Sequence, residues 1–316
     1  MLNHGLLVCS FLIRKKYVKD EIYALNADYQ YDDKLYHGII EMFCEFFSNY
    51  KEFHDDEKLM KMFSVDQDSI KIEEKPEYFM LSGIIRSGAY GIESQLTNRT
   101  TNKVTYKRGK DDADIKNFSF MMVIPKDAEE MIVKKGILLF ETIGPYGVKT
   151  ITTKNIKGFF SEKFGLTVET RSISVRLFME KLLKDENLGR ITLIKNRVSK
   201  DSSDNMFLTV GREETTYVKP TLKDSWISQV LEHIDGNAQD DIFEINDEVY
   251  NDIKFTFSQG GRTKTVRLKD IDKFSMVEEV PPYVYEGNGI NRDRLIGYME
   301  ETAKGYMNKL VVTQCN

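Results

Sequence analysis

The sequence predicts an α+β fold: an N-terminal half that is mainly an antiparallel β-meander with one helix, and a C-terminal mixed α/β half that ends in a long helix. Three observations predict this class. The 316 residues are 41% hydrophobic, which is enough for a substantial core. Short apolar runs separated by polar turns follow one another in the first half. Strand-like and helical periodicities are mixed in the second half.

In the first half, one segment has helical periodicity and the others resemble strands. Residues 33–50 carry apolar side chains at helical spacing, which is typical of a helix packed on a core: Leu35, Ile39, Met42, Phe43, Phe46 and Phe47. Apolar runs bounded by turn-forming or charged residues predict strands at residues 5–13, 69–74, 78–92, 103–109, 118–125 and 136–143. A charged loop over residues 108–117 joins two of these strands.

A turn containing Gly144, Pro145 and Gly147 follows the last of these runs. A strand, a glycine turn and a helix also make up a phosphate-binding loop. Lys149 and Thr150 come next, but the glycines are too close together to form a cradle of backbone N–H groups. We therefore interpret the turn as a structural corner. A helix over residues 153–164 should follow, with Thr152 or Thr153 as its N-cap.

The second half mixes both kinds of element. Helical patterns occur at residues 176–189, 222–234 and 293–312, and Gly189 is expected to end the first of these helices. Strand patterns occur at residues 166–175, 190–198 and 206–218. Residues 248–271 predict a β-hairpin that turns at Gly260-Gly261. We expect two domains, a β-rich domain over residues 1–165 and an α+β domain over residues 166–316.

Charge and cysteine content restrict the class of function. The net charge of −5, from 45 basic and 50 acidic residues, argues against a general nucleic-acid coat protein and against a charged membrane-surface role. Any contact with nucleic acid must come from a local basic patch. The isolated cysteines Cys9, Cys44 and Cys315 indicate reduced thiols. With neither a signal-peptide pattern nor a membrane-spanning run, the sequence predicts a cytoplasmic protein.

The strongest basic cluster lies in the predicted hairpin of residues 248–271. Its cations are Lys254, Arg262, Lys264, Arg267, Lys269 and, just beyond it, Lys273. Arg262, Lys264 and Lys269 recur at mostly even spacing, which would place several cations on one face of a strand. Such a ribbon can lie against a phosphate backbone. The alternative is an exposed hairpin face that the charges keep soluble.

An enzymatic alternative rests on paired carboxylates with a lysine. Metal-dependent nucleases hold Mg²⁺ between an acidic residue and a D/E-x-K unit. Residues 111–116 supply Asp111, Asp112, Asp114 and Lys116, and a second D-x-K unit comprises Asp252 and Lys254. Such triplets also occur in a solvated loop or an ordinary strand. No histidine has a partner at a metal-ligand spacing, so no metal ion and no cofactor are predicted.

Four stretches together resemble the RexA-type phage-exclusion proteins of the abortive-infection systems. They are LNHGLLVCSF at the N-terminus, ETIGPYGVKTITTKNIKGFF before and within the predicted helix, the basic DIKFTFSQGGRTKTVRLKDI, and YMEETAKGYMNKL in the terminal helix. The stretches are distributed along the whole chain. The net acidic charge departs from what DNA binding by such a protein requires.

The resemblance implies a non-enzymatic, homodimeric protein that binds double-stranded DNA with little sequence preference and acts in anti-phage defence. It also implies a membrane-protein partner encoded nearby. The positions that match the family's basic hairpin, and so would contact DNA, are Lys254, Arg262, Lys264, Arg267 and Lys269. Two other functions stay open, a Mg²⁺-dependent nuclease and a scaffold that recognises a phage protein.

Overall fold

Two stretches that are far apart in sequence build the larger of two structural units. The computed structural model describes residues 3–18, 21–126, 133–172, 179–180, 183–184, 188–197, 211–234, 243–245, 248–259, 262–273, 277–287 and 289–312. Unit 1 comprises Met1–Arg171 and Val277–Asn316, and unit 2 comprises Ser172–Met276. The first boundary lies close to the expected one at residue 165. Residues 277–316, expected in the second domain, instead pack in unit 1, because their helix covers a face of its sheet.

Unit 1 is built on a nine-stranded sheet of described residues. The main path through it is β12 (Leu166–Ser172), β1 (His4–Lys15), β10 (Gly136–Ile143), β9 (Lys116–Pro125), β6 (Tyr78–Ala89), β5 (Lys61–Glu74) and β4 (His54–Asp56). The central pairs, from β1–β10 to β6–β5, are antiparallel. Two short strands complete the sheet, β11 (Tyr146–Gly147) beside β10 and β19 (Val277–Glu279) beside β1.

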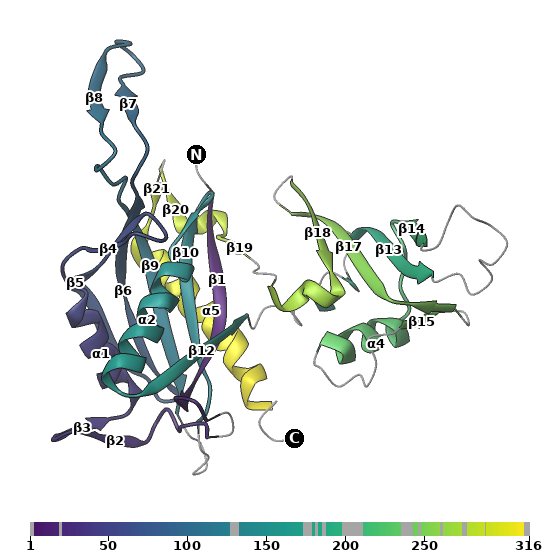
Figure 1. The fold of residues 1–316 in the computed structure, drawn as a ribbon, viewed down its shortest axis with the longest axis horizontal. Coiled ribbons are helices and arrows are strands. Elements are labelled where there is room, and N and C mark those ends of the chain that lie inside the picture. The colour runs from purple at the N-terminus through teal and green to yellow at the C-terminus, as the bar shows by residue number, and fades with distance from the viewer. Residues whose placement is uncertain are drawn as a thin grey trace. The chain divides into compact units, whose positions relative to one another are not determined.

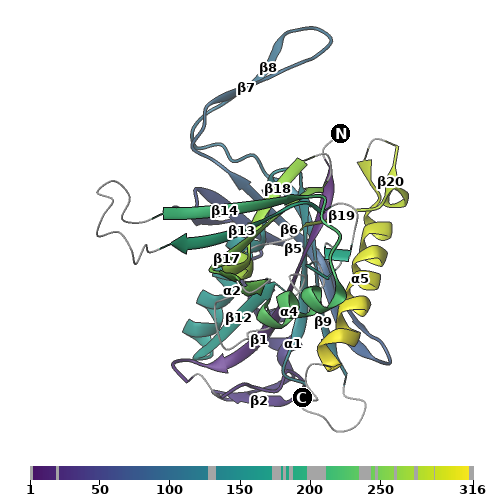
Figure 2. The same ribbon diagram turned by 90° about the vertical axis from the view of Figure 1, so that its right-hand side faces the viewer.

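Helices cover both faces of this sheet, as Figure 2 shows. On one face lie α1 (Ile39–Asn49) and α2 (Lys149–Lys163), whose aromatic side chains join the main apolar core. The opposite face is covered by α5 (Arg292–Val312), which buries Leu295, Met299, Ala303 and Met307. Because side chains of a strand alternate between the two faces, a sheet covered on both sides needs nearly continuous apolar strands. The buried run of β10, GILLFETI, fits this requirement.

The outer edge of β1 holds two strands. β10 occupies the other edge along His4–Phe11. β19 pairs with Gly5–Leu7 of β1, so it must lie on the same edge as β12. Smaller hairpins decorate unit 1, formed by β2 (Asp28–Tyr31) with β3 (Lys34–His37), β7 (Ser94–Thr97) with β8 (Val104–Arg108), and β20 (Tyr285–Glu286) with β21 (Gly289–Ile290). A short 3₁₀ helix, η2 (Pro282–Val284), precedes β20.

Unit 2 has its own sheet and its own core. The strands run in the order β14 (Gly211–Val218), β13 (Leu188–Arg197), β17 (Asp252–Gln259) and β18 (Arg262–Arg267). Helix α4 (Asp224–Ile234) packs its buried Ile227, Val230 and Leu231 with the apolar residues of the sheet. A small hairpin of β15 (Phe243–Ile245) and β16 (Glu248–Tyr250) and the 3₁₀ helix η1 (Leu268–Lys273) flank the sheet.

The α+β class, the β-rich first half and the long terminal helix are confirmed. Two helix starts differ from the predicted ones. Residues 34–37 form strand β3, and α1 begins only after Gly38, whose φ of 77° is unfavourable for other residues. α2 begins at Lys149 with Val148 as N-cap, so neither threonine caps it. The helix predicted over residues 176–189 lies largely outside the described residues, and Gly189 is in β13.

The turn after β10 is a hairpin corner. Ile143 pairs with Tyr146 and Thr142 with Gly147, so Gly144 and Pro145 form a two-residue connection between β10 and β11. Gly144 has a positive φ of 56°. Its N–H donates to the carbonyl of Asn3 at 2.8 Å. The N–H of Gly144 therefore binds a backbone carbonyl near the N-terminus, as expected for a structural corner.

In the part of the chain that the structure describes, no helix is long and apolar enough to cross a membrane.

We expect Phe160→Ala to destabilise unit 1 by about 3–5 kcal/mol. The Phe160 ring is fully buried between α2 and α1, 4.8 Å from the Phe43 ring. Urea unfolding followed by far-UV circular dichroism tests this expectation. The only tryptophan, Trp226, lies in unit 2, so its fluorescence transition should not shift. Tyr17→Ala, at a position that is 93% exposed, is the matched control and should change stability by less than about 0.5 kcal/mol.

Candidate nucleic-acid interface

The sheet of unit 2 has one apolar face and one polar face. Ile191, Leu193, Phe255 and Phe257 lie in the core that packs with α4. The alternate positions carry Glu214, Asp252, Ile194 and Val218 together with threonine and basic residues, and pairing across the strands places the latter side by side: Arg190, Thr192, Arg212, Thr216, Lys254, Thr256, Thr265 and Arg267. We call these residues the basic–threonine face. Two cross-strand hydroxyl pairs, Thr192–Thr216 and Thr256–Thr265, are each 3.0 Å apart.

Two acidic side chains on this face are each shared by two cations. The Glu214 carboxylate contacts the Lys254 ammonium at 3.0 Å and also the Arg212 guanidinium. The hydrogen bond from Lys254 and the nearby positive charges lower the pKa of Glu214 below its ordinary value. Glu214 is therefore ionised at neutral pH. One negative charge against two positive charges leaves this part of the face cationic.

The second shared acid is Asp252, which is almost completely buried. Its carboxylate lies 3.7 Å from the Lys269 ammonium and 4.0 Å from Nε of Arg267. Asp252 also accepts a hydrogen bond from the backbone N–H of Ile253 at 2.9 Å. The buried carboxylate thus contacts two partly exposed cations near the end of β18. Two positive charges against one negative charge leave this part of the face cationic as well.

Of the five residues expected to contact DNA, the structure brings Lys254, Arg267 and Lys269 together. Lys254 and Arg267 are direct cross-strand partners. Lys269 follows in η1 and therefore does not share the strand with the others. Arg262 and Lys264 occupy positions of β18 that belong to the opposite, apolar side of the sheet, where Lys264 pairs with buried Phe257 and Val266 follows, so they do not share the basic–threonine face with Arg267. Their side chains, and the expected turn at Gly260-Gly261, lie outside the described residues.

The aspartates of the nuclease alternative have structural partners. The Asp112 carboxylate accepts from the Tyr106 hydroxyl at 2.6 Å and from the Gly109 N–H at 2.7 Å. Asp114 forms an ion pair with Lys116, whose ammonium lies 4.3 Å from the centre of the Tyr146 ring. The described residues contain no cluster of three or more His, Cys, Asp or Glu side chains arranged to hold a metal ion.

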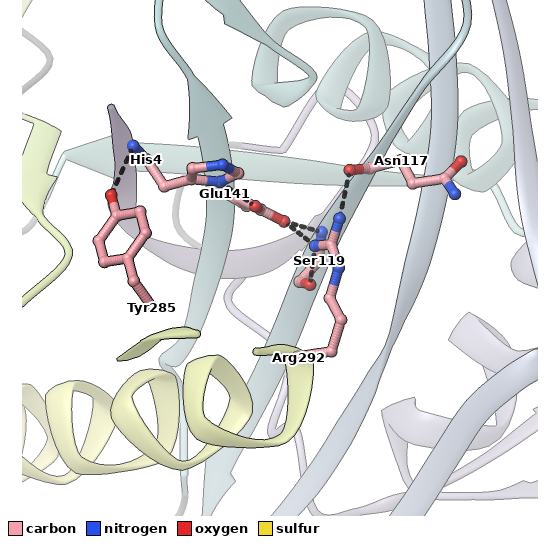
Figure 3. Close-up of polar contacts among 6 residues, drawn as sticks. All are labelled: His4, Asn117, Ser119, Glu141, Tyr285 and Arg292. Carbon is pink, nitrogen blue, oxygen red and sulfur yellow. Dashed lines mark hydrogen bonds and ion pairs between the residues drawn. The ribbon is translucent and has the colours of Figure 1, made fainter. Parts of the chain in front are cut away.

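A buried polar centre in unit 1, shown in Figure 3, joins strand β1 and the start of helix α5 to strands β9 and β10. Glu141 of β10 is completely buried on the α5 side. One carboxylate oxygen lies 2.6 Å from Nδ1 of His4, and the other accepts from the Ser119 N–H at 2.7 Å and from the Arg292 guanidinium. We call these residues, with Tyr285, the Glu141 centre.

Further contacts hold Arg292 and His4, the two side-chain partners of Glu141, in place. Arg292, the first residue of α5, also donates to the Ser119 hydroxyl at 2.7 Å and to the Asn117 carbonyl at 3.0 Å. The backbone N–H of His4 donates to the Tyr285 hydroxyl at 3.0 Å, and the two rings meet edge to face. Strands β1, β9 and β10 and helix α5 therefore all meet at a single carboxylate.

The partners of Glu141 keep it ionised despite its burial. Burial alone would raise its pKa, but the hydrogen bond from His4, the positive charge of Arg292 and the Ser119 N–H together bring it below its ordinary value. A buried carboxylate is tolerable only with such partners, since an unpaired one costs several kcal/mol. The Glu141 centre thus holds β1, β9 and the start of α5 against β10.

The sequence interpretation missed this centre because its members are far apart. His4 and Glu141 are separated by 137 positions, so no local spacing relates them. One signal was available, because Glu141 is the only charged residue in the otherwise apolar run GILLFETI. A charge in a strand that is buried on both faces requires a partner elsewhere in the chain.

The comparisons with known proteins give no relative. No family model, curated protein or solved structure matches this chain. The function must therefore be argued from the geometry of the chain itself.

We expect Glu141→Gln to reduce the stability of unit 1 by about 3 kcal/mol at pH 7, because Arg292 loses its counter-charge and His4 loses its carboxylate hydrogen-bond partner. The partial exposure of Arg292 keeps the loss at the lower end of the range for buried pairs. The pKa of Glu141 is lower in the folded state than in the unfolded state. Its stabilisation is therefore fully present above the unfolded value of about 4.3 and disappears as the pH falls through the folded value.

Urea unfolding of both proteins between pH 7 and pH 3 measures this difference. The gap between the wild type and Glu141→Gln should narrow as the pH falls below about 4. Glu52→Gln, at an exposed position of the same unit, is the control and should change little. A gap that stays constant over the whole pH range would show that the charge of Glu141 does not stabilise the fold.

Proposed function

We propose that this protein binds double-stranded DNA, with little sequence preference, through phosphate contacts on the basic–threonine face of unit 2. The observation that carries the proposal is the arrangement of cations there, with two cations for each acidic side chain. Threonine hydroxyls alternate with these cations across the strands. Lysine, arginine and threonine side chains are among the groups that contact DNA phosphates.

The ion pairs on this face are compatible with phosphate binding. Lys254, Arg212, Lys269 and Arg267 are all partly exposed. Glu214 is also exposed, so its ion pairs contribute at most about 1 kcal/mol each, whereas the buried Asp252 needs its two cations as counter-charges. A phosphate can therefore replace a Glu214 contact at little cost, and it can join Lys269 and Arg267 while Asp252 stays in place. Each phosphate neutralised in this way releases condensed counterions, which favours binding at low salt. Phosphate contacts carry no base information, which supports binding without sequence preference.

The biological setting of the proposal comes from the sequence resemblance. A RexA-type role would make this a cytoplasmic, homodimeric sensor in anti-phage defence, without catalytic activity and with a membrane-protein partner. The net charge of −5 means that the protein as a whole does not attract DNA. Binding would therefore be confined to the local cationic surfaces.

The double variant Lys254→Gln/Arg267→Gln tests the proposed face. Each lost phosphate contact should flatten the slope of log K against log salt by about 0.9, so duplex affinity should fall most at low salt. Electrophoretic mobility shift or fluorescence anisotropy at two or more salt concentrations measures this. The control is Lys51→Gln/Lys157→Gln, which makes the same charge change at exposed positions of unit 1.

Equal affinities and slopes for the two double variants would eliminate this face as the binding site. Unchanged Trp226 fluorescence would show that unit 2 of the variant is folded. A wild-type protein that fails to bind any duplex at low salt would contradict the proposed function and favour the scaffold alternative.

We expect no cleavage of supercoiled plasmid in Mg²⁺ or Mn²⁺, because Asp112 and Asp114 are occupied by Tyr106, Gly109 and Lys116. Agarose gels after long incubation check this expectation. Metal-dependent nicking that disappears in Asp114→Asn would instead support the nuclease alternative. That variant keeps the size of the side chain and removes only its charge.

A further inference from the structure

A two-stranded arm projects from unit 1, as both Figure 1 and Figure 2 show. It consists of β7, β8 and the turn over residues 98–103, and we call it the β7–β8 arm. The two strands pair only with each other among the described elements. Every residue of β7 is exposed, and so is every residue of β8 but the last. An arm of this kind buries almost no apolar surface, so it contributes little to the core.

The arm nevertheless has a defined conformation at both ends. At its base, Arg108 donates to the carbonyls of Asp112 and Ala89, and the Gly91 N–H donates to the Lys110 carbonyl at 2.7 Å. The Asp112 carboxylate fixes the Tyr106 hydroxyl there. These bonds connect the arm to the end of β6.

The turn at the tip is ordered by one side chain. The side-chain amide oxygen (Oδ1) of Asn98 accepts hydrogen bonds from the backbone N–H groups of Thr100 and Thr101, each at 2.9 Å. The backbone N–H of Asn102 donates to the backbone carbonyl of Asn98 at 2.8 Å, and Asn102 has a positive φ of 53°. Asparagine tolerates this conformation better than most residues. The tip is therefore held in shape before any ligand binds, which lowers the entropic cost of binding.

The charge of the arm is opposite to that of the whole chain. Residues 94–110 contain no aspartate or glutamate and carry Arg99, Lys103, Lys107, Arg108 and Lys110. The chain as a whole has a net charge of −5. A basic segment that stands away from an acidic body is a local positive surface, and it attracts polyanions.

Apolar side chains accompany these cations. Leu96 and Tyr106 are cross-strand partners, and they are 61% and 49% exposed. Val104 is 46% exposed. A two-stranded ribbon fits the major groove of duplex DNA, where side chains such as these contact sugars and thymine methyl groups while cations contact the phosphates.

We propose that the β7–β8 arm is a second DNA contact, which lies in a groove of the duplex with Arg99, Lys103 and Lys107 against the phosphates. This inference rests on the proposed function and adds a site in unit 1 to the face in unit 2. The absence of acidic residues favours a uniformly anionic partner. A protein partner would present charges of both signs, which an arm without carboxylates would not match.

The triple variant Arg99→Gln/Lys103→Gln/Lys107→Gln tests the arm and leaves Arg108, which holds its base, unchanged. Duplex affinity at about 0.1 M salt should fall about tenfold or more, and the salt slope should flatten by about 0.9 for each phosphate contact removed. The control Lys51→Gln/Lys71→Gln/Lys157→Gln makes the same charge change at exposed positions of unit 1 and should keep both values. A second variant, Leu96→Ser, should weaken binding several-fold without changing the salt slope.

The proposed DNA contacts of the arm and of the basic–threonine face are tested independently of each other. Affinity that is equal in the arm variant and its control, but lost in Lys254→Gln/Arg267→Gln, would overturn the arm and leave the proposed function intact. Affinity lost only in the arm variant would support the arm and eliminate the face. A wild-type protein without duplex binding would overturn both. A changed sedimentation coefficient of the arm variant, with DNA affinity retained, would show that the arm contacts a second copy of the chain and would also overturn its role in DNA binding.

Discussion

The large sheet of unit 1 must bury both of its faces, and the course of the chain follows from this requirement. Strands such as β9 and β10 are apolar on both sides, so leaving either face in water would expose a large hydrophobic surface. The segment before residue 172 supplies α1 and α2 for one face only. The other face is covered by α5, which the chain reaches only after it has formed unit 2. The long terminal helix is therefore part of unit 1, on the face opposite α1 and α2.

The Glu141 centre fixes the position of α5 along the face of the sheet that it covers. Apolar packing alone would tolerate several registers of α5 along the sheet, because methionine and leucine side chains adapt to one another. Arg292 reaches Glu141 and Asn117 only in one register, since its planar guanidinium must meet acceptors on two strands. His4 and Tyr285 extend the same network to β1 and to the hairpin before α5. We infer that the network selects one arrangement among several of similar hydrophobic energy.

Elements with strong local signals could be predicted from the sequence. The apolar periodicity of residues 39–47, the long apolar run from residue 78 and the hairpin pattern of residues 252–267 predict the correct kinds of element. Residues 34–37 were assigned to a helix because Leu35 matched its period, although in β3 this side chain is exposed and only Tyr36 is buried. The even spacing of Arg262, Lys264 and Lys269 could not show that the strand ends at Arg267. Contacts that depend on tertiary structure, such as His4 with Glu141, have no local pattern. The same holds for the return of α5 to unit 1.

Both strands that flank unit 2 lie on one edge of β1. β12 leads into unit 2, β19 leads out of it, and each is hydrogen-bonded in the sheet of unit 1. In topological terms, unit 2 is a long insertion within a fold that is complete without it. The entropy of closing such a loop grows only with the logarithm of its length, so a domain costs little more there than a short turn. Unit 2 is therefore a module that evolution could exchange or remove, while the sheet, its helices and the Glu141 centre keep every contact described above.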